Sequence, residues 1–215
     1  MILYSQPTSP YSAAVRTAVY AKGLPIEIAP PPGGLQSDEY RAVSGSGTVP
    51  CLMLDDGSPL PESTVILAYL DEKFPETPLI PAGPPEARAR ARLMTRLGVE
   101  GVMDPIVGMF HDLSIGAPDA RERALERITA GLAKLERFAA AEGFAAGPAF
   151  SQADCVLGVA LMGVGAFGGT LLGAPDLLTR YPRLAALAGR LAAHPAVARV
   201  MGELQAAMAE NPLPG

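Results

Sequence analysis

The chain begins MILYSQPTSPYSAAVRTAVYAKG (residues 1–23), and this stretch indicates more about the architecture than any other. The apolar run Ile2–Tyr4 predicts a short β-strand. After a loop, the segment from Ser9 to Lys22 predicts a helix, because serine suits the N-cap position and proline suits the first helical position. Gly23 then marks the helix end, where a left-handed residue is favoured. The order is therefore strand, loop, helix.

In the next residues strands and helices continue to follow one another, and they predict a mixed sheet. Asp56-Gly57 is a strong hairpin signal between two short strands. We expect strands at residues 26–28, 51–54 and 59–60, and helices at residues 37–43 and 62–74. A parallel pair of strands extended by an antiparallel hairpin and packed by helices is the thioredoxin-like plan.

A proline-punctuated connection at residues 78–85 predicts a domain boundary. We therefore expect an α/β thioredoxin-like domain at residues 1–77 and an all-α helical domain at residues 86–215. The helices of the second domain are expected at residues 86–113, 118–141, 151–167, 182–193 and 195–210.

Composition excludes several classes of partner. Lys and Arg total 17 against 22 Asp and Glu, so the net charge of −5 argues against a nucleic-acid-binding protein. We expect no membrane span and no signal peptide, and hence a cytoplasmic protein. Cys51 and Cys155 are far apart and lack the spacing of metal ligands, so we expect buried packing residues and no metal.

Ser9 is the first candidate functional residue. An ordinary helix N-cap is one interpretation. The other is that the free N–H groups and partial positive charge of the helix start hold an anion such as a thiolate. A serine hydroxyl there can donate a hydrogen bond to sulfur and lower a thiol pKa from ~8.5 towards ~6–7.

Two dipeptides are the other candidates. Pro50 can begin a strand for steric reasons alone, but a cis Val49–Pro50 bond would leave the Val49 main chain to pair with a peptide-like ligand. Glu62 and Ser63 are favourable in the first turn of a helix. They could also hold the ammonium and carboxylate groups of an amino-acid end.

Taken together, these signals describe a receptor for glutathione, and the chain resembles the cytosolic glutathione transferases over essentially its whole length. Ser-Pro-Tyr-Ser-x-x-Val-Arg (residues 9–16) looks like the serine-type motif of the zeta and tau classes. The resemblance implies that Ser9 stabilises the thiolate and that Val49 with cis Pro50 pairs with the cysteinyl backbone. It implies that Glu62 and Ser63 bind the γ-glutamyl end. It also implies a homodimer that uses glutathione as co-substrate.

The chain departs from the family pattern at residues 44–48, Ser-Gly-Ser-Gly-Thr, where a familiar contact to glutathione is replaced. After the unusual loop at residues 30–34, Gln36 is the candidate contact to the glycine end. Tyr4 is an alternative thiol partner, and Ser12 a weaker one.

Later in the chain, Ser151 and Asp154 resemble the family's helical capping box, a folding feature. The second substrate is expected between the domains. Four apolar residues recur there at helical spacing, although core packing is the commoner explanation of such a stripe: Met103, Ile106, Val107 and Phe110. His111 adjoins them and could act as a general acid or base.

Three functions remain open at this point. The first is a glutathione S-transferase acting in detoxification, which keeps the thiol ionised for attack on an electrophilic, largely apolar small molecule. The second is a glutathione-dependent isomerase or ether-cleaving enzyme. The third is a non-catalytic glutathione-binding or scaffold protein. A disulfide reductase is disfavoured, because no cysteine stands at the start of the first helix.

Overall fold

The computed structural model describes residues 1–210 and divides into two compact units. Unit 1 contains Met1–Pro78 together with the described residues from Ala198 onward, and unit 2 contains Leu79–Val197. The C-terminal part of the last helix thus belongs to unit 1, whereas the sequence analysis assigned it to the helical domain. The physical reason is a set of polar contacts between that helix and the first helix of the chain.

Unit 1 is built on a four-stranded sheet in the order β2-β1-β3-β4. The strands are β1 (Ile2–Tyr4), β2 (Glu27–Ala29), β3 (Cys51–Met53) and β4 (Pro59–Pro61). β1 is parallel to β2 and antiparallel to β3, which pairs antiparallel with β4. Leu3 and Leu52 lie opposite each other in the register and are fully buried. The mixed sheet predicted from the sequence is confirmed.

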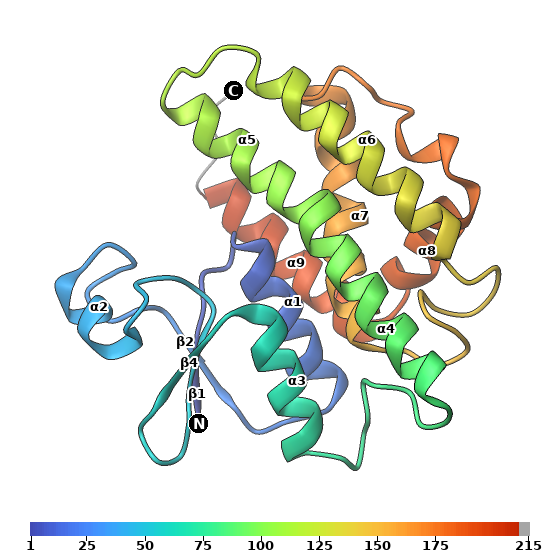
Figure 1. Ribbon diagram of the computed structural model, residues 1–215. Coiled ribbons are helices and arrows are strands. Elements are labelled where there is room, and N and C mark those ends of the chain that lie inside the picture. Colours follow the sequence, from blue (N-terminus) through green and yellow to red (C-terminus); the bar gives the residue numbers. More distant parts are fainter. Residues whose placement is uncertain (211–215) are drawn as a thin grey trace. The chain divides into compact units, whose positions relative to one another are not determined.

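Three helices pack on this sheet: α1 (Pro10–Ala21), α2 (Asp38–Ser44) and α3 (Ser63–Lys73). Figure 1 shows α1 and α3 together on one side of the sheet and α2 on the other. Every α1 residue from Ser12 to Val19 is buried. α1 is therefore the central element of unit 1, and its start is held by the packing of the whole unit.

Unit 2 is helical, as predicted. It contains α4 (Pro85–Gly98), α5 (Asp104–Ser114), α6 (Ala120–Phe138), α7 (Gln152–Thr170), the 3-10 turn η2 (Leu178–Arg180), α8 (Pro182–Ala192) and the first residues of α9 (Pro195–Glu210). The helix expected over residues 86–113 is interrupted by a π-helical turn, η1 (Val99–Met103). α6 begins two residues later than expected, after Asp119 in a left-handed conformation with φ of 56°.

α7 is the buried central helix of unit 2. Ser151 and Asp154 form the predicted capping box, in which the Asp154 carboxylate accepts from the Ser151 N–H at 2.8 Å. Among the described residues, α7 is the one helix long and apolar enough to cross a membrane, a feature that the sequence analysis did not anticipate. Its most apolar window is 61% buried within the protein, as in the core helix of a globular domain.

Candidate functional site

Ser9 caps α1 with an extended backbone, and its Oγ accepts a hydrogen bond from the Ser12 N–H at 3.2 Å. A hydroxyl group has one hydrogen to donate in addition to its acceptor lone pairs. The capping bond uses a lone pair, so it leaves the Ser9 O–H to donate to a ligand. The two interpretations of Ser9 are therefore compatible, because one side chain can cap the helix and hydrogen-bond an anion.

The start of α1 is electrostatically suited to an anion. Pro10 occupies the first helical position, and the first turn carries no acidic side chain. The partial positive charge of the helix N-terminus is thus unopposed by its own first turn. A thiolate close to Ser9 would gain from both this charge and the hydroxyl hydrogen bond.

The Val49–Pro50 bond is cis in the structure. Val49 lies outside the ladder of β3, which begins at Cys51. The preceding carbonyl, that of Thr48, accepts a hydrogen bond from the buried Tyr40 hydroxyl at 2.7 Å. Tyr4 packs edge-on against the Tyr40 ring, with the ring centroids 5.7 Å apart. The Tyr40 hydroxyl therefore holds the segment that leads into Val49.

Glu62 and Ser63 connect β4 to α3. Glu62 has φ of 73° and ψ of 113°, an unusual conformation for a residue with a side chain. Its side chain is exposed and makes no capping bond to α3. Ser63 is buried at the first position of the helix. Strained backbone of this kind persists where the surroundings impose it and is common at functional sites.

The sheet register brings these three segments to one end of the sheet. Tyr4, the last residue of β1, pairs with Cys51, the first residue of β3. Cys51 in turn pairs with Pro61, the last residue of β4. The loop to Ser9, the Val49–Pro50 bond and the Glu62–Ser63 segment all continue from these three positions. These candidate residues therefore lie at the same end of the sheet although they are separated in the sequence.

Gln36 precedes α2, and its exposed side chain accepts a hydrogen bond from Arg41 at 3.3 Å. The register does not bring it into the group above. Within residues 1–210, no three His, Cys, Asp or Glu side chains are grouped so as to hold a metal ion.

Arg16 is a residue of this region that the sequence analysis did not single out. Its side chain is only 3% exposed, and it donates to Ser5 Oγ at 2.7 Å and to the carbonyl oxygens of Gln6 and Pro7, each at 3.0 Å. Burial lowers the pKa of the Arg16 guanidinium, an effect that the nearby Glu203 carboxylate opposes. Two sequence signals pointed to it: Arg16 ends the motif of residues 9–16, and it is the one cation in a helix of mostly small and apolar residues.

The stripe predicted in the helical domain is core in part. Met103 and Ile106 are buried, and Phe110 packs edge-on against Phe167 with the ring centroids 5.2 Å apart. His111 is exposed near the end of α5. His194 directly precedes Pro195, the first residue of α9, and its half-buried ring stacks on Phe150 at a centroid distance of 3.9 Å.

Comparison with known proteins assigns the family. Residues 3–78 match the N-terminal domain of glutathione S-transferases, and residues 118–190 match the C-terminal domain. The chain belongs to the glutathione S-transferase family, and its fold is that of the cytosolic members.

Individual relatives differ in their activities. The chain is 34% identical to a probable maleylacetoacetate isomerase 2 from Drosophila melanogaster, over 73% of this chain and 70% of the relative. It is 29% identical to a glutathione S-transferase from Pseudomonas putida, over 96% of this chain and 93% of the relative. Among solved structures, a maleylacetoacetate isomerase from Methylobacterium extorquens AM1 with bound malonate and GSH superposes with a TM-score of 0.76 at 30% identity, covering 100% of both chains.

Proposed function

We propose that this protein is an enzyme that binds glutathione and keeps its thiol ionised at Ser9 for attack on a small electrophilic molecule. The observation that carries the proposal is the register that brings the end of β1, the start of β3 and the end of β4 together at one end of the sheet. That end of the sheet combines a hydroxyl donor at a helix start, a main-chain segment outside the ladder and an exposed carboxylate.

Each group has a separate role in holding the tripeptide. The Val49 N–H and C=O pair with the cysteinyl residue as an added strand would. The Glu62 carboxylate binds the ammonium of the γ-glutamyl end, while the Ser63 hydroxyl and the free N–H groups of α3 bind its carboxylate. Gln36 is the proposed contact to the glycine end. No metal takes part.

In the transferase reaction, the glutathione sulfur forms a bond to an electrophilic carbon and a leaving group departs with its electron pair. The enzyme contributes a lowered thiol pKa and orientation of the two reactants, without a covalent intermediate on the protein. Val107 and Phe110, the half-buried members of the apolar stripe, are the proposed contacts for the second substrate. We further propose that the protein is a cytoplasmic homodimer with a role in detoxification. Light scattering tests the dimer, because the mass of the particle should be twice the 22.2 kDa of one chain.

A second candidate is glutathione-dependent isomerisation, and the isomerase names among the relatives favour it. In that reaction the thiolate adds to a carbon–carbon double bond, the adduct rotates, and elimination restores both the double bond and the thiolate. Both reactions begin with the same thiolate, so Ser9 has the same role in each. A non-catalytic glutathione-binding protein is the third candidate.

The test begins with the pKa of the bound thiol, followed by the ultraviolet absorbance of the thiolate as pH is raised. In the wild type we expect this pKa to lie at least one unit below the ~8.5 of a free thiol, and in Ser9→Ala we expect it to return towards ~8.5. Ser9→Thr, which keeps a capping hydroxyl, is the matched control and should retain much of the shift. An unchanged pKa in Ser9→Ala would contradict the proposal.

A substrate panel then separates the candidate reactions. It contains a halogenated dinitrobenzene, a cis-unsaturated diacid and an aryl ether. Stoichiometric loss of glutathione with the first compound indicates a transferase, and conversion of the second without loss of glutathione indicates an isomerase. Cleavage of the third compound indicates the ether-cleaving enzyme. Glutathione binding without turnover of any compound favours the non-catalytic protein.

A further inference from the structure

The guanidinium of Arg16 holds the segment that leads to Ser9. It contacts three consecutive residues after β1, namely the Ser5 hydroxyl and the carbonyl oxygens of Gln6 and Pro7. The Gln6 carbonyl also accepts the Ser9 N–H at 3.2 Å. One carbonyl oxygen thus receives both the Arg16 side chain and the main chain of Ser9. A shift of Arg16 would therefore move the capping residue.

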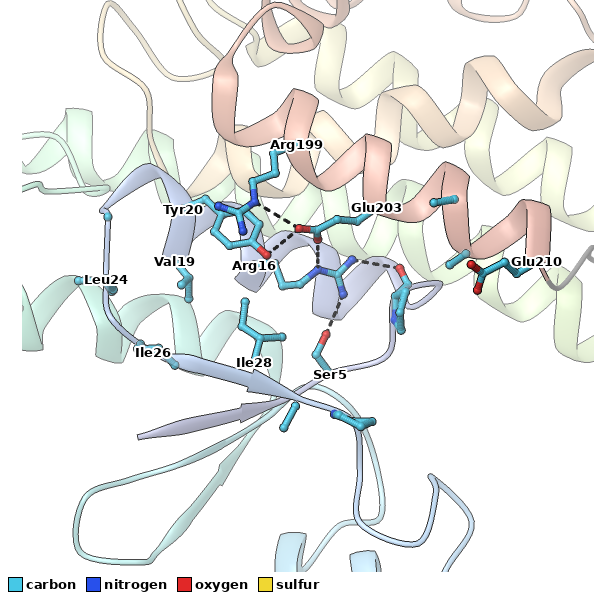
Figure 2. Close-up of a pocket in the computed structure, with 16 residues that line it drawn as sticks. Ser5, Arg16, Val19, Tyr20, Leu24, Ile26, Ile28, Arg199, Glu203 and Glu210 are labelled. Atoms are coloured by element: carbon cyan, nitrogen blue, oxygen red, sulfur yellow. Dashed lines mark hydrogen bonds and ion pairs between the residues drawn. The ribbon is translucent and has the colours of Figure 1, made fainter.

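Glu203 in α9 fixes the position of Arg16. Its Oε2 lies 3.1 Å from Arg16 Nε, and its Oε1 accepts the Tyr20 hydroxyl at 2.7 Å. Arg199 pairs with the same carboxylate at 3.4 Å and lies 3.7 Å above the Tyr20 ring. Figure 2 shows Glu203 between Arg199, Tyr20 and Arg16, with Ser5 on the far side of the guanidinium.

The burial of these charges makes the contact more than a surface ion pair. The Arg16 side chain is 3% exposed and that of Glu203 is 33% exposed. A buried guanidinium needs a counter-charge, and removing the one that Glu203 supplies beside Arg16 Nε leaves an uncompensated charge. Without Glu203, the unpaired Arg16 guanidinium should turn towards solvent, because its charge is hydrated there. This movement would release the carbonyl groups to which it donates.

We propose that Glu203 is a positioning residue for the thiol site, acting through Arg16 to hold the β1–α1 segment and hence the hydroxyl of Ser9. Part of the site is thereby set by the last helix of the chain, far from it in sequence. The inference rests on the proposed role of Ser9 in glutathione binding. Glu203 itself touches neither the tripeptide nor the second substrate.

The variant that tests the proposal is Glu203→Gln, with Glu210→Gln as the matched control. Glu210 lies on the same helix as Glu203, and both residues line a pocket of about 980 Å³. In Glu203→Gln we expect the pKa of the bound thiol to rise by about one unit and kcat to fall about tenfold, because a small misplacement of a catalytic group is costly. The KM for glutathione should change little, and Glu210→Gln should match the wild type.

The direction of the pKa change separates positioning from simple electrostatics. Removing a negative charge near the site would by itself favour the thiolate and lower the thiol pKa. A lower or unchanged pKa in Glu203→Gln overturns the proposal, as does a loss of thermal stability with no change in pKa. Arg16→Lys, which keeps the charge but not the set of donors, should reproduce the raised pKa.

A second measurement does not depend on glutathione. Amide hydrogen exchange in the ligand-free protein should be faster over residues 5–12 in Glu203→Gln than in Glu210→Gln. Equal exchange in the two variants would refute the positioning role even if the protein ignores glutathione. Conversely, a wild type that leaves the thiol pKa at ~8.5 refutes the proposed function alone.

Discussion

Two glycines allow α6 and the π-helical turn η1 to approach closely in unit 2, and a single methyl group at one of them should disrupt this contact. Gly131 lies in α6 and Gly101 in the π-helical turn η1. A Cβ atom added to Gly131 would lie 2.1 Å from the Gly101 carbonyl oxygen and 2.7 Å from its Cα. Ordinary carbon–oxygen contacts are about 3.3 Å or longer. The two helices would have to move apart by about 1 Å.

The magnitude follows from what surrounds the new methyl group. The three nearest atoms that it meets belong to the main chain of Gly101, so side-chain rotation cannot relieve these overlaps. Overpacking of this kind costs about 1–3 kcal/mol or more, whereas alanine gains about 1 kcal/mol in helix propensity over glycine. Because the overlap is with main chain, we take the upper end of that cost. We expect Gly131→Ala to lower the free energy of unfolding by about 2 kcal/mol.

Gly189→Ala is the matched control. Gly189 lies in α8, is exposed, and has no atom within 4 Å of an added Cβ. The same substitution there should raise the free energy of unfolding by about 0.5–1 kcal/mol. Urea unfolding followed by far-ultraviolet circular dichroism measures both, and the chain has no tryptophan to report by fluorescence. Equal shifts of the two variants, in either direction, would refute the close contact between η1 and α6.

Three further predictions concern polar groups. Burial raises the pKa of Asp154 to about 6, above the ordinary 3.8, so the native state binds its proton more tightly than the unfolded state. Its contribution to stability should therefore fall as pH rises from 3.8 to 6, a trend that urea midpoints should show in the wild type and not in Asp154→Asn. Tyr40→Phe removes the donor to the Thr48 carbonyl, so it should lower the free energy of unfolding in urea by about 1 kcal/mol. It should also raise the KM for glutathione more than it lowers kcat, and an unchanged KM would contradict the role given to this contact. Among the described residues the buried Ser12 Oγ has no hydrogen-bond partner, so Ser12→Ala should leave stability within about 0.5 kcal/mol and the bound thiol pKa unchanged, whereas a raised pKa would transfer the thiolate role from Ser9 to Ser12.

The parts of the fold that the sequence predicts well are those with local causes. The helix after Ser9 begins where the cap and the following proline place it, and the strand Ile2–Tyr4 has the predicted bounds. The capping box of Ser151 and Asp154 is equally local. The candidate residues Ser9 and Ser63 could be found because each stands at a helix start, where the free N–H groups depend only on the neighbouring residues.

The interruption in the long helix of unit 2 had only a partial local signal. Pro105 lies inside residues 86–113, and a proline within a helical pattern indicates a break, but it does not indicate the π turn that the structure forms at Val99–Met103. Gly101 in that turn approaches Gly131 in α6, and this contact depends on a second helix. The hydrophobic periodicity of one segment does not show where a second helix packs closely against it. The same reason explains why the stacking of His194 on Phe150 could not be predicted from the sequence.

The division of the chain at Ala198 shows where such non-local contacts matter for function. Glu203 lies 183 positions after Tyr20, yet its carboxylate accepts a hydrogen bond from the Tyr20 hydroxyl and forms an ion pair with the Arg16 guanidinium. A lone arginine in an apolar helix predicts only that some counter-charge must exist, since a buried cation without one is costly. Its partner could not be chosen from sequence alone among the 22 Asp and Glu residues of the chain. The cap that holds a thiolate is thus a local feature, whereas the contact that holds the cap in place is a property of the folded unit.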